Sequence, residues 1–118
     1  MKIAVTTNNS KSSSEVASTF ARAPWVLVYD TESKTWESHE NSGTADVAHG
    51  AGTQAAEFIS RLGVEVLISS ACGPNAFRAL SAADIKVFVG SGRTAEEALR
   101  DYEAGRLRQL TEANGPGR

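Results

Sequence analysis

The sequence predicts a single α/β domain with a mixed five-stranded sheet, helices on both faces, and an antiparallel second strand. In the second half of the chain, short apolar runs rich in β-branched residues alternate with segments of helical periodicity. In the first half, two strand-like runs are separated by a short polar connection, which indicates a hairpin. A length of 118 residues is typical of one domain.

Five segments are predicted as strands because their centres are apolar or alternate with polar residues. The segments are residues 2–7, 25–30, 35–39, 64–69 and 85–89. A short helical turn is predicted at residues 15–21, between the first and the second of these strands. The last two strands are joined through a helix, so we expect them to be parallel with a right-handed crossover.

Three helices follow from the spacing of apolar residues. The first spans residues 52–62, where Ala55, Phe58, Ile59 and Leu62 share one face and Gly63 ends the helix. The second starts at Pro74, which suits a first helical turn. The third starts with a T-x-x-E capping box from Thr94 to Glu97.

The composition and net charge of the chain argue against some classes of binding partner. The formal net charge of −2 gives no electrostatic reason to expect nucleic acid or an anionic membrane. No apolar run reaches the ~20 residues of a membrane helix, and the start is too polar for a signal peptide, so we expect a cytoplasmic protein. A single cysteine allows no intrachain disulfide. The domain is expected over residues 1–108, with a flexible tail at 109–118.

Two loops are the candidate ligand-binding segments, because ligands of open α/β sheets gather beyond the carboxyl ends of the strands. Residues 69–75 and 90–94 leave neighbouring parallel strands and lead into helix starts, whose free N–H groups favour anions. The alternative is that glycine and serine simply form ordinary strand-to-helix turns. The candidate ligand-binding residues in these loops are Gly73, Asn75, Gly90, Ser91 and Gly92.

Two side chains could bind a soft metal. Cys72 lies just before a helix start, a position that lowers the pKa of a thiol and favours the metal-binding thiolate. His49 precedes another helix start, next to Gly50. The alternatives are a small buried hydrophobe for Cys72 and, favoured on the sequence alone, a surface histidine for His49. His39, in the hairpin, is expected to be inert, and one Cys with two His does not complete a structural zinc site.

Several motifs resemble the dinitrogenase iron–molybdenum cofactor biosynthesis family, which includes NifX-like carriers and the carboxy-terminal domain of NifB-type proteins. They are HGAGTQAA from His49, GPNAF from Gly73, the strand at residues 85–89, TAEEAL from Thr94, and ARAPW up to Trp25. The resemblance covers about residues 1–108. It implies a three-layer RNase H-like fold and the binding of iron–sulfur or molybdenum-containing clusters. Where the family often has S-x-H-F-G-R-A, Thr19 and Ala21 replace the histidine and the glycine.

The leading hypothesis is therefore a non-catalytic binding or carrier protein for a metal–sulfur cluster or a related anionic complex. Cys72 and His49 would bind the metal, the loops would donate N–H groups, and Arg22 would balance charge unless it forms a surface salt bridge. Cofactor-assembly proteins would be its partners. One alternative is a metal-free regulatory or interaction domain. A less favoured one is a nuclease, whose two-metal chemistry needs carboxylates that residues 2–9 lack.

Overall fold

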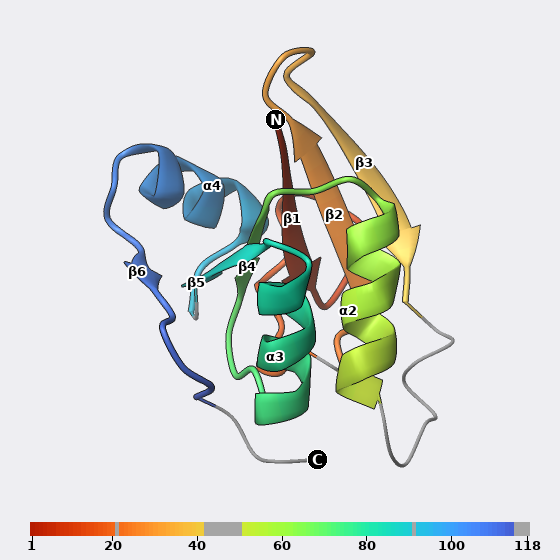
Figure 1. The fold of residues 1–118 in the computed structure, drawn as a ribbon. Helices are drawn as coiled ribbons and strands as arrows, with labels where there is room; N and C mark the ends of the chain where they lie inside the picture. The colour runs from red at the N-terminus through yellow and green to blue at the C-terminus, as the bar shows by residue number, and fades with distance from the viewer. Residues whose placement is uncertain (21, 42–50, 91, 115–118) are drawn as a thin grey trace.

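The computed structural model describes residues 1–20, 22–41, 51–90 and 92–114. Its strands are Lys2–Thr7 (β1), Trp25–Asp30 (β2), Thr35–Glu40 (β3), Val66–Ser69 (β4), Lys86–Val89 (β5) and Arg108–Gln109 (β6). Its helices are Ala51–Arg61 (α2), Pro74–Ala82 (α3) and Ala95–Glu103 (α4), as Figure 1 shows. Within the described residues, no helix has the length and apolar character that crossing a bilayer requires.

The strands form one mixed sheet in the order β3-β2-β1-β4-β5-β6. β1, β4 and β5 are parallel, and β2 is antiparallel to both of its neighbours. This confirms the predicted α/β class and the antiparallel second strand, but the described residues form a sheet of six strands, not five. The additional strand, β6, pairs with β5 through only two residues, too few to produce a recognisable alternation in the sequence.

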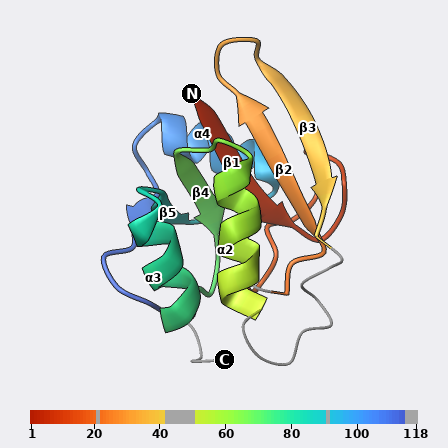
Figure 2. The same ribbon diagram turned by 45° about the vertical axis from the view of Figure 1, so that its right-hand side comes forward.

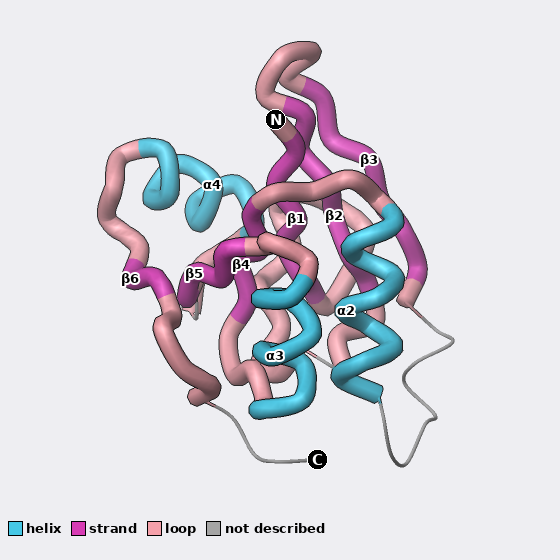
Figure 3. The backbone as a smooth tube through the Cα atoms, viewed as in Figure 1, coloured by secondary structure: helices cyan, strands magenta, loops and turns pink. Residues whose placement is uncertain are grey.

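Alternation along the strands creates a core on each side of the sheet. Leu67 of β4 belongs to the core beneath α2 and α3, together with Ile59 and Leu80. The next residue, Ile68, belongs to the opposite core, with Leu99 of α4. Figures 2 and 3 show the resulting layers, with α2 and α3 side by side on one face and α4 on the other. The RNase H-like relationship stays a prediction.

The segment between β1 and β2 differs from the sequence prediction of a helical turn at residues 15–21. Its described residues instead make isolated β-bridges, Glu15 with Thr94, Val16 with Thr7, and Thr19 with Ala71. The helical prediction was wrong because the backbone groups of this segment bond to distant strand ends rather than to each other.

The last described residues pack against the domain. After β6, the N–H of Leu110 donates to the carbonyl of Val87 over 2.8 Å, and Leu110 is buried. Asn114 bonds to Cys72. Whether residues 109–118 behave as a flexible tail stays a prediction, as does the domain boundary at residue 108.

The two edges of the sheet are unlike each other. β3 is a full-length outer strand, and its Glu37 and Glu40 are exposed. The opposite edge is the two-residue β6, which covers the outer side of β5.

Gly90, at the end of β5, allows α4 to approach the sheet closely. A Cβ atom built on Gly90 would lie 2.6 Å from the Ile68 Cγ2 atom and 3.2 Å from the Ala98 Cβ atom. Both distances are shorter than an ordinary van der Waals contact. Gly92, two residues later, has φ +78, which favours glycine for a conformational reason. Packing and backbone conformation therefore explain both glycines without a ligand.

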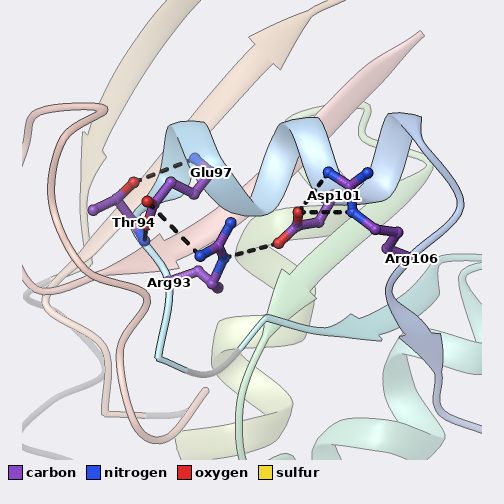
Figure 4. Close-up of polar contacts among 5 residues, drawn as sticks. All are labelled: Arg93, Thr94, Glu97, Asp101 and Arg106. Atoms are coloured by element: carbon purple, nitrogen blue, oxygen red, sulfur yellow. Dashed lines mark hydrogen bonds and ion pairs between the residues drawn. The ribbon is translucent and has the colours of Figure 1, made fainter.

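A network of charged residues fixes the loop between β5 and α4 (Figure 4). The Asp101 carboxylate accepts a hydrogen bond from Arg93 Nε at 2.9 Å and one from Arg106 Nη2 at 3.0 Å. These hydrogen bonds, from Arg93 first, lower the pKa of Asp101 below its usual 3.8. Thr94 and Glu97 complete the capping box predicted from the sequence. Arg93 thus connects the loop to the far end of α4.

We expect Gly90→Ala to destabilise the fold by about 1–3 kcal/mol, because the added methyl overlaps the Ile68 side chain in a packed core. Chemical denaturation measures the change. Gly105→Ala is the control, because a Cβ atom at Gly105 meets nothing within 4 Å. This substitution therefore destabilises the fold only through the positive φ of residue 105. The Gly90→Ala penalty should shrink in an Ile68→Ala background. An equal penalty in both backgrounds would refute the steric explanation.

We expect Asp101→Asn to remove part of the acid sensitivity of the fold. Because the folded-state pKa of Asp101 is lowered, its charge stabilises the fold above pH ~4 and this contribution is lost as pH falls through the folded pKa. The difference in unfolding free energy between parent and variant should therefore be largest near neutral pH and diminish toward pH ~2. Glu103→Gln, an exposed substitution on α4, is the control. A difference that does not vary with pH would contradict the assignment.

Candidate functional site

The candidate ligand-binding residues that the structure describes lie around one edge of the sheet. β1, β4 and β5 are parallel and all end at this edge, and the antiparallel β2 begins there. Arg22 precedes β2, Gly73 and Asn75 lie at the start of α3, and Gly90 and Gly92 follow β5. We call this region the carboxyl edge. His49, Gly50 and Ser91 lie outside the described residues, so a shared Cys72–His49 site stays a prediction.

Residues 16–20 line the carboxyl edge through backbone hydrogen bonds. Val16 N–H donates to the Arg93 carbonyl at 2.8 Å, and Ala17 N–H donates to the Thr6 carbonyl at 2.9 Å. Ala71 N–H donates to Ser18, and Phe20 N–H donates in turn to Ala71. The segment therefore connects the ends of β1, β4 and β5. The sequence predicted only a helical turn for this segment, although its apolar residues within a polar stretch were a signal of burial.

The start of α4 is closed to a ligand. Ala95 N–H donates to the Ser14 carbonyl at 2.8 Å, and Glu96 N–H donates to the Ser12 carbonyl at 3.0 Å. Glu97 N–H donates to the Thr94 hydroxyl. The expectation of free N–H groups at this helix start was therefore wrong, because residues 12–14 already accept them. Whether Gly90, Ser91 and Gly92 contact a ligand is a separate point and stays a prediction.

The start of α3 is different. Gly73 is the N-cap residue and provides no side-chain cap, and Pro74 follows in the first turn. The backbone N–H groups of Asn75 and Ala76 have no hydrogen-bond partner among the described residues. Unpaired N–H groups and the helix dipole together favour an anion at this position.

The start of α2 lies at the same end of the molecule as the start of α3. The two helices pack beside each other, and in Figure 1 both begin at the lower end, where β1 and β4 finish. Their positive dipole ends therefore act on the same region. The chain enters α2 at Ala51, directly after residues that lie outside the described part.

Buried hydroxyl groups add polar character to the carboxyl edge. Thr6 Oγ1 and Ser69 Oγ, at the ends of β1 and β4, lie 2.6 Å apart and share a hydrogen bond. Ser70 is only 6% exposed, and its Oγ has no partner among the described residues. A buried unpaired hydroxyl is costly, which is an argument for a ligand contact here. No role of its own was predicted for Ser70 from the sequence, although two consecutive serines at a strand end were the available signal.

Cys72 does not have the environment that its position in the sequence predicts. Its side chain is 0% exposed and lies in the apolar core beneath α2 and α3. Burial raises the pKa of the Cys72 thiol to about 11, whereas proximity to a helix start was expected to lower it. Desolvation is the cause of this shift, and in this conformation Cys72 packs as a small apolar side chain.

His39, expected to be inert, lies on β3 with its ring centroid 6.2 Å from that of Phe58 in α2. Its Nε2 atom lies 2.6 Å from a Glu37 carboxylate oxygen. In the part of the chain that the structure describes, no cluster of three or more His, Cys, Asp or Glu side chains could hold a metal ion.

Solved structures include two close relatives. The apo form of the orange protein from Desulfovibrio gigas is 32% identical, with a TM-score of 0.93 over 96% of this chain and 95% of that one. A Thermotoga protein provisionally named as a NifB protein is 40% identical, with a TM-score of 0.86 over 98% of both chains. A Methanocaldococcus jannaschii protein provisionally named as a dinitrogenase is 14% identical and shows the fold alone, with a TM-score of 0.71 over 95% of this chain and 96% of that one.

The curated proteins contain no match to this chain. The family model described as dinitrogenase iron-molybdenum cofactor, in contrast, matches residues 1–105, which is nearly the whole of the domain. The motifs from Gly73 and Thr94, which resembled this family, both lie inside the matched range. The match and the two close relatives agree, and the chain belongs to the dinitrogenase iron–molybdenum cofactor family.

Proposed function

We propose that the protein binds and carries a metal–sulfur cluster, of the iron–sulfur or iron–molybdenum type, without catalysing a reaction. The observation that carries this proposal is the open start of α3, where the Asn75 and Ala76 N–H groups are unpaired among the described residues. Metal–sulfur clusters are commonly anionic, and their sulfurs accept hydrogen bonds from such groups. Membership of a family named for a metal cofactor supports the same conclusion.

In this proposal, each part of the carboxyl edge has a distinct role. N–H groups near Gly73 and Asn75, with the Ser70 hydroxyl, donate hydrogen bonds to the cluster, and Arg22 balances its charge. Gly50 and the loop of Gly90, Ser91 and Gly92 border the cluster. Cys72 and His49 are the proposed metal ligands. The protein works in the cytoplasm and exchanges the cluster with cofactor-assembly proteins.

A second candidate function is a metal-free regulatory or interaction domain. The buried, neutral state of Cys72 favours it, because a cluster carrier would be expected to present its thiolate to the ligand. A nuclease has less support. Two-metal phosphoryl chemistry needs convergent carboxylates, whereas the end of β1 offers Thr6 and Thr7.

We expect the protein to bind tetrathiomolybdate, a small molybdenum–sulfur dianion, and Asn75→Asp to weaken this binding by about fivefold or more. The added carboxylate complements the α3 dipole, so the fold should stay stable while the anion is repelled. Titration by absorbance or calorimetry measures the affinity. Ser81→Asp, at the opposite end of α3, adds the same charge and should have little effect. Equal weakening by both variants would show that only net charge matters.

Protein purified without oxygen provides the direct test of a bound cluster. We expect the purified protein to absorb visible light. We also expect iron or molybdenum to elute together with the protein in gel filtration, because a cluster held by several donors should stay bound on dilution. Colourless, metal-free protein that also fails to bind tetrathiomolybdate would overturn the carrier function and favour the interaction domain.

We also expect no cleavage of RNA or DNA with magnesium or manganese, because β1 carries no carboxylate. The assay compares the parent protein with Thr6→Val after repeated purification. Metal-dependent cleavage that persists in the parent protein and is lost in the variant would contradict this expectation.

A further inference from the structure

The C-terminal segment crosses the carboxyl edge after β6. Leu110 is 5% exposed and belongs to the same apolar core as Cys72. Its N–H donates to the carbonyl of Val87, so the first residue after β6 is still hydrogen-bonded to β5. Thr111 and Glu112 are exposed, and the next well-anchored residue is Asn114. The segment is therefore held at its two ends and free along its outer side.

Asn114 makes three hydrogen bonds to the loop that precedes α3. Its Oδ1 accepts the Cys72 N–H at 2.8 Å, and its own N–H donates to the Cys72 carbonyl at 3.1 Å. Its Nδ2 donates to the Ser70 carbonyl at 3.4 Å. One side chain thus holds both ends of the three-residue run from Ser70 to Cys72, directly before the open helix start.

The Cys72 side chain lies in the same apolar core as Leu110, at the loop that Asn114 holds. It is 0% exposed, and Asn114 takes up both backbone polar groups of the same residue. The contact is also local, because three hydrogen bonds and the packing of Leu110 hold it, whereas β4 and β5 are bonded along their full lengths. Segments with few contacts open at a lower free-energy cost than the whole domain.

We propose that residues 110–114 form a strap, fastened by Asn114, that closes over the Cys72 loop and controls access to the thiol. With the strap closed, Cys72 is an apolar core residue. With the strap open, the thiol meets solvent at the start of α3, where the positive end of the helix favours the thiolate. The step in which the open state receives a cluster rests on the proposed function, whereas the strap itself does not.

The test uses 5,5′-dithiobis(2-nitrobenzoate), which needs no cluster. The Cys72 thiol first loses its proton to solvent, and the thiolate then attacks the reagent's disulfide. A protein–nitrobenzoate disulfide forms, and one nitrothiobenzoate thiolate leaves and is counted by absorbance. As Cys72 is the only cysteine in the chain, the signal reports one site.

We expect slow modification of the parent protein and a rate at least about tenfold higher for Asn114→Ala, which loses both side-chain hydrogen bonds. Asn114→Asp keeps an acceptor for the Cys72 N–H but no donor to Ser70, so its rate should lie between the two. Thr111→Ala, on the exposed part of the strap, should react like the parent. Measuring the modification rate at low urea concentrations separates two routes to the thiol. The rate hardly changes with urea if the thiol reacts through local opening, and it rises steeply if the whole domain must unfold.

Equal rates for the parent and Asn114→Ala would overturn the strap, as would a rate that rises with urea as steeply as global unfolding. Hydrogen exchange of the parent protein provides an independent measurement if a variant folds poorly. The Cys72 and Leu110 N–H groups should then exchange faster than those of β4, and exchange only through global unfolding would refute the proposal. If the protein binds no tetrathiomolybdate but shows the expected thiol modification rates, the strap is supported and the carrier function is not.

Discussion

The common direction of β1, β4 and β5 is the constraint on which the rest of the structure depends. Parallel strands must be joined by crossovers, and each crossover helix has to run back toward the strand starts. α2 leads into β4, and α3 leads from β4 into β5, so both helices begin at the carboxyl edge. This places the positive ends of α2 and α3 together, without any residue being selected for that purpose. The ligand-binding chemistry of the edge is a consequence of topology before it is a property of side chains.

Whether a helix start is available to a ligand depends on residues far away in the sequence. α3 and α4 both follow a strand and a glycine-containing loop, yet their first N–H groups differ in their partners. The carbonyls of Ser12 and Ser14 occupy the start of α4, and no described residue does the same for α3. A polar segment of low complexity thus decides which of two similar sites stays open.

The sequence was sufficient for features that depend on local periodicity. The helical face from Ala55 to Leu62, the hairpin of β2 and β3, and the capping box at Thr94 all follow from residues close in the chain. The environment of Cys72 could not be predicted, because its side chain is buried in a core built from distant parts of the chain, with Phe20 and Leu110 among its members. β6 was missed because two residues show no period, and Ser70 because an unpaired hydroxyl becomes apparent only when its neighbours are known.

The unequal edges of the sheet have a consequence for the behaviour of the protein in concentrated solution. An uncovered outer strand offers a row of backbone donors and acceptors to which another molecule's strand can be added, and this is a common beginning of aggregation. Among the described residues, no strand pairs with the outer side of β3, but a second copy added there would bring its own carboxylates near the exposed Glu37 and Glu40. Carboxylates on adjacent paired strands repel each other, so the addition of another molecule's strand to β3 is disfavoured. On the other side, β6 leaves only two residues for pairing, and the sheet therefore ends within one molecule.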